Sequence, residues 1–239
     1  MTRIVLVTGG TSGIGRAVAA RFAADDAGVV ITGRHPDRVE STAKELGVAG
    51  VACDATRPEQ VADLSMRLGE RLDVLVNAAG GLPEEPPTDL GPLETLVAEW
   101  QSNLAQNLLS AVITTASFQD KLDQGGTVVS IGSIGAERRG GAYGASKAAL
   151  GAWNASLSAH LGPRGITTNV ISAGYVAGTN FFRGQMTDDR HRALVEETHD
   201  KRPGAPDDIA ETAYFLASRA ARHITGQTIH VNGGAFTTR

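Results

Sequence analysis

Short runs rich in Val and Ile alternate with segments of helical periodicity along the whole chain. The runs show little polar alternation, which is typical of parallel strands covered on both faces. Strands are predicted over Ile4–Thr8, Val29–Thr32, Val48–Cys53, Val74–Asn77, Thr127–Ile131, Thr167–Ile171 and Thr228–Val231. Helices are predicted over 14–24, 36–46, 58–69, 93–120, 143–161, 188–199 and 207–218. This alternation predicts an α/β fold: a doubly wound parallel sheet with helices on both faces.

No linker or repeat divides the 239 residues, so we expect one domain over residues 1–239. The Pro- and Glu-containing stretch Leu82–Pro92 is predicted to be a loop. No apolar stretch reaches the roughly 18 residues of a membrane-spanning helix, and the N-terminal segment is too short for a signal peptide. A single cysteine, Cys53, fits a reducing compartment. We therefore expect a cytoplasmic protein with no membrane partner.

Charge and histidine placement argue against two further classes of function. The net charge is −4 at pH 7 and there is no basic block, which disfavours nucleic acid as a partner. The six histidines are scattered, and no cluster of His, Cys and Glu has metal-ligand spacing. We expect no metal centre.

A glycine-rich turn, Thr8–Gly15, separates the first predicted strand from the first helix. Gly9, Gly13 and Gly15 would allow a tight turn and a close approach of backbone N–H groups to a pyrophosphate at the helix N-terminus. The spacing is not G-x-G-x-x-G, and no Gly-Lys-Ser/Thr follows, so a P-loop is not indicated. On this turn alone, an ordinary glycine-rich connection is the alternative.

Tyr143 and Lys147 form a second motif, in the string Tyr143-Gly144-Ala145-Ser146-Lys147. On a helix, residues four apart lie on the same face. A free tyrosine has a pKa of about 10, which is poorly suited to proton transfer near neutrality. A nearby ammonium favours the phenolate, so we expect Lys147 to lower the pKa of Tyr143. The pair would then act as a proton donor or acceptor, although such pairs also arise by chance.

Taken in order, these motifs resemble those of the short-chain dehydrogenase/reductase family, whose glycine turn reads Thr-Gly-x-x-x-Gly-x-Gly. Asn77-Ala78-Ala79-Gly80 is similar to the family's Asn-Asn-Ala-Gly segment, and the tail Ile224–Gly234 to its closing strand. The resemblance covers nearly the whole chain and is closest to 3-oxoacyl reductases. It implies a Rossmann fold that binds a nicotinamide dinucleotide and transfers hydride at a carbonyl or secondary alcohol.

The resemblance implies a set of cofactor-binding residues, among them an adenine contact at Asp54. The set is Gly9, Thr11, Ser12, Gly13, Ile14, Gly15, Arg34, Asp54, Asn77, Ala78, Gly80, Tyr143, Lys147, Gly174 and Val176. The second strand ends in Gly33-Arg34 without the acidic residue that binds the ribose of NAD, and arginine suits the 2′-phosphate of NADP. We therefore favour NADP(H), with NAD(H) as the alternative and a solvated surface arginine as the bland interpretation of Arg34.

The resemblance also implies that Asn107 and Ser133 act beside Tyr143 and Lys147. Trp100 and Asn107-Leu108 fit the family's Trp-x6-Asn-Leu segment, whereas Asn103 lies one turn too early. Ser133 is ten residues before Tyr143, where the family usually has thirteen; Ser130 has the usual separation but would lie within a strand. We choose Ser133 and interpret the difference as a deletion in Glu137–Gly141.

Three further expectations follow from the resemblance. Ala173 replaces the usual proline before Gly174, which puts the rigidity of that loop in doubt. The loop Gly178–Gln185, with Phe181 and Phe182, lies where the family has its substrate lid. The small residues along the Tyr143 helix predict a homo-oligomer, a tetramer in this family. The competing function is a catalytically silent NADP-binding regulator or scaffold on the same fold.

Overall fold

The computed structural model describes residues 2–84, 89–138 and 140–238. Within these ranges seven strands form one sheet in the order β3-β2-β1-β4-β5-β6-β7, and each neighbouring pair is parallel. The strands are β1 (Ile4–Thr8), β2 (Gly28–Gly33), β3 (Ala49–Ala52), β4 (Leu72–Asn77), β5 (Leu122–Ser133), β6 (Thr167–Ala173) and β7 (Thr228–Val231). The predicted doubly wound sheet is confirmed.

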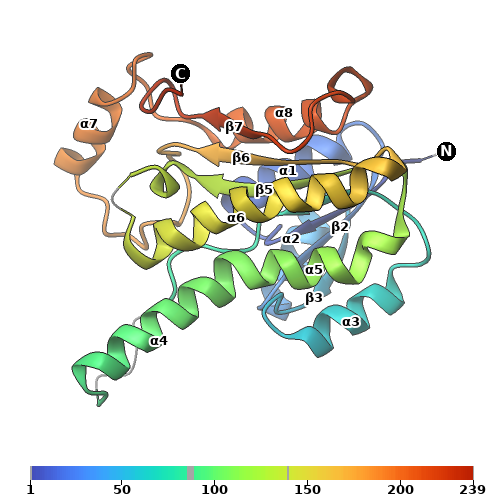
Figure 1. The fold of residues 1–239 in the computed structure, drawn as a ribbon, viewed down its shortest axis with the longest axis horizontal. Coiled ribbons are helices and arrows are strands. Elements are labelled where there is room, and N and C mark those ends of the chain that lie inside the picture. The colour runs from blue at the N-terminus through green and yellow to red at the C-terminus, as the bar shows by residue number, and fades with distance from the viewer. Residues whose placement is uncertain (1, 85–88, 139, 239) are drawn as a thin grey trace.

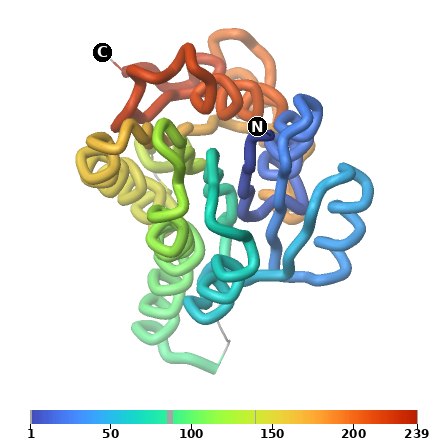
Figure 2. Tube along the Cα trace, turned by 90° about the vertical axis from the view of Figure 1, so that its right-hand side faces the viewer, coloured from blue at the N-terminus to red at the C-terminus, as the bar shows by residue number. Residues whose placement is uncertain are grey.

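Helices cover both faces of this sheet (Figure 1). They are α1 (Gly13–Ala23), α2 (Pro36–Leu46), α3 (Pro58–Arg67), α4 (Pro92–Leu104), α5 (Ser110–Phe118), α6 (Gly141–Leu161), α7 (Asp188–Glu196) and α8 (Pro206–Leu216). Four of them begin at a proline, which suits the first helical position because the N–H there has no helical partner. Figure 2 shows α5 and α6, in green and yellow, on the opposite side from the blue helices of the first third of the chain.

Two clusters of buried side chains hold the layers together. On one face, Phe22 of α1 and Ile209 of α8 pack with Val7 and Val129 of the sheet. On the other face α3, α5 and α6 pack on Leu6, Leu75 and Val128. The chain runs outward from β1 in both directions, so strand order reverses between β1 and β4. In folds of this kind the ligand lies at that reversal, at the carboxyl ends of the strands.

The structure differs from the prediction over 93–120. The single expected helix is divided into α4 and α5 by one wide π-helical turn, Ala105–Leu109, which contains Asn107. Such turns occur mostly as single insertions within α-helices, often at functional sites. Two expected loops, Leu82–Pro92 and Glu137–Gly141, lie partly outside the described residues because 85–88 and 139 are not among them.

Over residues 2–84, 89–138 and 140–238, no helix is long and apolar enough to cross a membrane. In the same part of the chain no three or more His, Cys, Asp or Glu side chains are grouped so that they could hold a metal ion.

Candidate functional site

The glycine turn lies between the end of β1 and the start of α1, beside the reversal of strand order. Gly9 and Gly13 have φ values of +67° and +50°, in the left-handed region that favours glycine. A Cβ on Gly15 would lie 2.3 Å from the carbonyl oxygen of Gly9. The backbone of this turn therefore has no room for a Cβ at Gly15 and favours glycine at Gly9 and Gly13.

The start of α1 is open to a ligand. Ser12 is the N-cap residue, and its exposed side chain makes no capping hydrogen bond to the helix, so backbone N–H groups next to Ile14 are left for another acceptor. Thr179, from the segment after β6, lies across the turn, with its methyl carbon 3.4 Å from where a Gly13 Cβ would be. The donors and the shape fit a pyrophosphate. Thr179 was missed in the sequence, which gives no signal that it faces this turn.

Arg34 and Asp54 lie at the ends of β2 and β3. Arg34 is exposed, directly after Gly33, and a Cβ on Gly33 would lie 2.8 Å from the methyl carbon of Thr11. The Asp54 carboxylate accepts hydrogen bonds from the backbone N–H and hydroxyl of Thr56, at 2.9 and 2.8 Å. Both side chains lie at the carboxyl edge of the sheet, and their predicted cofactor contacts stay predictions.

The segment after β4 is tied to β1. The backbone N–H groups of Ala78 and Ala79 donate to the hydroxyl of Thr8, at 3.2 and 3.1 Å. A Cβ on Gly80 would lie 2.7 Å from Oδ1 of Asn107 and 3.3 Å from Nζ of Lys147. The predicted cofactor segment and the predicted catalytic residues thus meet at Gly80.

Ser133 is the last residue of β5, and a Cβ on Gly135 would lie 3.3 Å both from its hydroxyl oxygen and from a ring carbon of Tyr143. The same oxygen accepts the N–H of Gly135 at 3.1 Å. Ser130 lies inside the strand, and Nδ2 of Asn77 donates to its hydroxyl at 3.4 Å. The structure therefore brings Ser133 to Tyr143 and leaves Ser130 in a buried contact between two strands.

Lys147 lies one turn beyond Tyr143 on α6 and is only 6% exposed. Its ammonium donates to the carbonyl oxygen of Ile131 at 2.8 Å and lies 6.0 Å from the centre of the Tyr143 ring. Burial lowers the pKa of Lys147 to about 8. The ammonium is thus held by the backbone of β5 and lies near the Tyr143 ring. Among the described residues, no hydrogen bond joins it to the phenol oxygen.

The expected pKa shift of Tyr143 is wrong in this structure. Burial raises the pKa of Tyr143, and the hydrogen bond with Ser133 opposes this rise only in part. We attribute the difference to distance and desolvation, because the Lys147 ammonium is bonded to Ile131 while the phenol is buried. The phenol is therefore held in its protonated form.

Asn107 lies in the π-turn and is 1% exposed. Its Oδ1 accepts the N–H of Gly81 at 2.8 Å, and its Nδ2 donates to the carbonyl oxygens of Gly81 at 3.0 Å and Asn103 at 3.2 Å. Gly81 was not predicted, although the double glycine after Asn77-Ala78-Ala79 was a visible signal. Asn107 fixes the backbone that leads from Gly80 toward the loop.

The predicted positions after β6 lie at the base of a long excursion. Ala173 ends β6 in register with Val231, so strand pairing rather than a proline orients the following residue. A Cβ on Gly174 would lie 2.7 Å from Cα of Asn232. Val176 is buried and forms a bridge with Gly204. Residues 178–203, which we call the lid segment, thus leave and rejoin the fold at one place.

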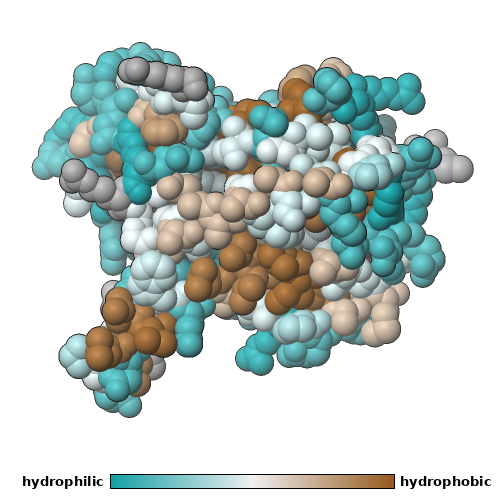
Figure 3. Space-filling model, viewed as in Figure 1, coloured by the Kyte–Doolittle hydropathy of each residue, from teal (hydrophilic) through white to brown (hydrophobic). Residues whose placement is uncertain are grey.

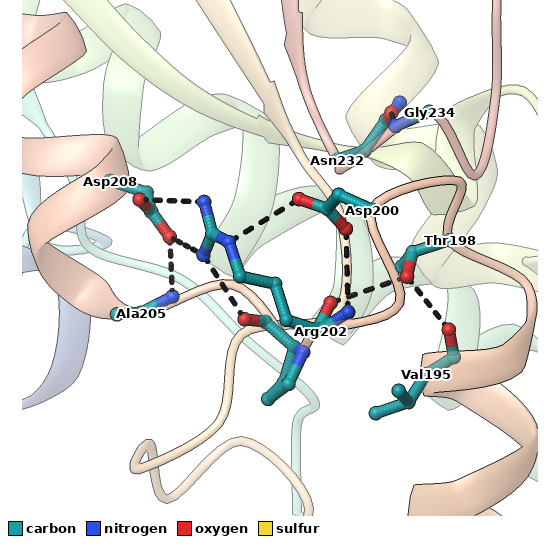
Figure 4. Close-up of polar contacts among 9 residues, drawn as sticks. Val195, Thr198, Asp200, Arg202, Ala205, Asp208, Asn232 and Gly234 are labelled. Carbon is teal, nitrogen blue, oxygen red and sulfur yellow. Dashed lines mark hydrogen bonds and ion pairs between the residues drawn. The ribbon is translucent and has the colours of Figure 1, made fainter.

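A polar cluster fixes the returning end of the lid segment (Figure 4). The Arg202 guanidinium contacts Asp200 at 3.3 Å and Asp208, near the start of α8, at 2.7 Å. Asp208 also accepts the N–H of Ala205 at 2.8 Å, and Thr198 donates to the carbonyl oxygen of Arg202 at 3.3 Å. The base of the lid segment is therefore anchored independently of its tip.

Comparison with known proteins shows the family of the chain. The model of the family described as enoyl-(acyl carrier protein) reductase matches residues 9–236. The chain is 32% identical over 248 residues to 3-oxoacyl-(acyl-carrier-protein) reductase FabG of Escherichia coli, covering 98% of this chain and 97% of that one.

Two solved structures are also similar. One is a short-chain type dehydrogenase/reductase from Mycobacterium ulcerans, with TM-score 0.87, 29% identity and coverage of 98% of this chain and 89% of that chain. The other is a blue fluorescent protein from a metagenomic library in complex with NADPH, with TM-score 0.83, 30% identity and 98% of each chain covered. A match over nearly the whole chain, with the glycine turn and the serine–tyrosine–lysine cluster in place, shows that the chain belongs to the short-chain dehydrogenase/reductase family of oxidoreductases.

Proposed function

We propose that the protein reduces a ketone, or oxidises the corresponding secondary alcohol, with NADP(H) and with Tyr143 as the general acid or base. The observation that carries the proposal is the grouping of the Ser133 hydroxyl, the Tyr143 ring and the buried ammonium of Lys147 at the carboxyl edge of the sheet, with Lys147 beside Gly80. Two hydroxyl side chains and a cation are thus gathered at one end of the sheet.

Different residues at the carboxyl edge of the sheet would hold different parts of the cofactor. The start of α1 offers N–H groups to the pyrophosphate, and Arg34 offers a guanidinium to a 2′-phosphate. Asp54 and the backbone at Ala78 and Gly80 line the same carboxyl edge of the sheet. When bound, NADPH supplies the hydride.

Tyr143 supplies the proton. In reduction its phenol donates to the carbonyl oxygen of the substrate, and the Ser133 hydroxyl hydrogen-bonds the same oxygen. A pKa raised by burial keeps the Tyr143 phenol protonated at neutral pH, which is the form that reduction needs.

Loss of NADPH absorbance with a panel of ketones tests the proposal. Turnover that Tyr143→Phe abolishes would support it. Saturable NADPH binding without turnover of any ketone would instead favour the catalytically silent regulator.

Assembly into a homo-oligomer, a tetramer by the family resemblance, is part of the proposal. The helix α4 projects from the body, and apolar side chains gather on it and between α5 and α6 (Figures 1 and 3). The exposed apolar residues there include Leu93, Leu96, Val97, Trp100 and Leu109. Exposed apolar surface of this kind marks protein contacts, and closed symmetry is the common arrangement of identical chains.

Light scattering at micromolar concentration tests the assembly. A mass equal to one 24.8 kDa chain would contradict it. Leu96→Asp should lower the mass, whereas Met66→Asp, also on an exposed helix face but away from α4, should leave it unchanged.

A further inference from the structure

A chain of aromatic rings runs from Tyr143 into the lid segment. The centre of the Phe181 ring lies 5.4 Å from that of Tyr143, and Phe182 follows at 5.0 Å from Phe181. Tyr175, at the base, lies 6.0 Å from Phe182. Its hydroxyl is 2.7 Å from Nδ1 of His191 on α7. Of these lid rings, Phe181 is the one that contacts Tyr143.

Two arginines of the lid segment near these rings make contacts with groups other than Tyr143. The Arg190 guanidinium lies 5.0 Å from the centre of the Phe182 ring, and Arg183 donates to the carbonyl oxygen of Leu82. This last bond joins the lid segment to the loop after β4. The group that the lid presents to Tyr143 is therefore the hydrocarbon ring of Phe181.

The position of Phe181 constrains the substrate. A carbonyl oxygen that takes the Tyr143 proton lies about 2.6–3.2 Å from the phenol oxygen. A substituent on the carbonyl carbon then lies in reach of the ring that packs on Tyr143. Aromatic rings favour tilted or offset contact with one another beyond the gain from burial alone.

We propose that Phe181 determines substrate specificity and selects uncharged ketones, or the corresponding alcohols, with an aromatic ring attached to the carbonyl carbon. The inference rests on the proposed function and narrows it to one substrate class. Phe181 contacts the substrate's ring, and Tyr143 and Ser133 contact its oxygen.

Two ketones with equal numbers of carbon atoms test the inference: acetophenone and cyclohexyl methyl ketone, which differ in having a planar aromatic or a puckered saturated ring. With NADPH, Phe181→Leu should lower kcat/KM for acetophenone about three- to tenfold more than for the saturated ketone, which is the range of one aromatic pair. For each ketone, kcat/KM of the variant is divided by kcat/KM of the wild type. Comparing these two ratios removes the difference in intrinsic reactivity between the ketones. Equal losses for both ketones would overturn the inference while leaving the proposed function intact.

Two variants control for disruption of the fold. Phe215→Leu makes the same change on an exposed face of α8 and should alter neither ratio. Phe181→Tyr keeps the ring and should retain the preference for acetophenone. If Phe181→Leu does not fold, loss of the preference in Phe181→Tyr counts against the inference.

Saturation-transfer NMR of acetophenone gives a readout without turnover. Binding to the wild-type chain that weakens in Phe181→Leu and persists in Phe215→Leu supports the aromatic contact. Equal binding by all three proteins overturns it. Binding with this pattern but no reduction of any ketone would reject the proposed reaction alone.

Discussion

The glycine turn and the lid segment bound the same site but are held by different means. The turn is fixed by its own backbone, since a Cβ on Gly9 or Gly15 would clash with neighbouring backbone and Gly13 has a positive φ that favours glycine. The lid is fixed by contacts with distant parts of the chain, since Phe181 packs on Tyr143 and Arg183 donates to the carbonyl oxygen of Leu82. A backbone constraint leaves a trace in local sequence, whereas contacts between distant side chains leave little.

Tyr143→Phe should separate turnover from cofactor binding most sharply, because Phe181 of the lid packs on Tyr143 whereas the glycine turn is untouched. Removing the proposed acid is expected to lower kcat by about 10²–10⁴, with NADPH affinity nearly unchanged because the glycine turn is intact. Steady-state kinetics with a cofactor titration measures both. Tyr214→Phe makes the same change on α8 and should keep full turnover; a loss below tenfold in Tyr143→Phe would reject the role.

Ser133→Ala should be the next largest effect. It would remove the proposed hydrogen bond to the substrate oxygen, a change that typically costs about 10²–10³ in kcat. Ser130→Ala, three residues earlier in the same strand, should change kcat far less because its hydroxyl meets Asn77. A larger loss of kcat in Ser130→Ala than in Ser133→Ala would mean that Ser130, and not Ser133, is the serine that acts with Tyr143.

Arg34→Ala should act on the cofactor side alone. Loss of a charge-assisted hydrogen bond is expected to weaken NADPH binding about ten- to a hundredfold, with little change for NADH. Fluorescence titration of both cofactors decides this. Arg57→Ala, exposed at the start of α3, is the control. Equal weakening of both cofactors would make Arg34 structural.

Burial of Lys147 predicts a pH dependence of stability. Its pKa falls from 10.5 to about 8 on folding. Between these values the unfolded chain holds a proton that the folded chain has released, so the free energy of unfolding rises with pH. Burial raises the pKa of the Cys53 thiol from 9.0 to about 11, which opposes part of this rise above about pH 9. Lys147 alone should contribute about 2 kcal/mol to the rise by about pH 9.5. The raised pKa of Tyr143 lowers the free energy of unfolding as the pH increases above about 10, the usual pKa of tyrosine. At about pH 9.5 this effect is still small.

Lys147→Met removes the titrating group and should flatten this rise. Urea unfolding of both proteins from about pH 7 to 9.5 measures it. Parallel curves for wild type and variant would show that the ammonium is not buried as described.

Sequence predicted the sheet, because strand runs are local. It also predicted that Ser133, at a strand end, is the serine beside Tyr143, although the usual spacing would have chosen Ser130. It placed β5 at Thr127–Ile131, while the strand spans Leu122–Ser133. Gly125 and Gly126 interrupt the apolar run there, and pairing with β4 overrides them through an irregular register between Leu72 and Val74. The contact between the rings of Phe181 and Tyr143 could not be predicted, since it depends on the path of the lid segment between β6 and α8.

The raised pKa of Tyr143 was missed for a related reason. Charge neighbours can be inferred from helical spacing, but desolvation depends on everything packed around the group. The Tyr143 phenol is covered partly by the lid, which is the region that sequence described least well.

The π-turn at Ala105–Leu109 couples two properties of the chain that are otherwise unrelated. It fits one extra residue into a single wide turn, which changes the relative phase of α4 and α5 little. Deleting one residue between Trp100 and Asn107 would instead rotate these two by about 100° relative to each other, carrying Leu96 and Trp100 to another side while the hydrogen bonds of Asn107 hold it at Gly81. The phase of a single helix thus sets both the orientation of the Asn107 amide and the orientation of an exposed apolar stripe. Single-residue insertions and deletions in this helix would therefore change one orientation relative to the other.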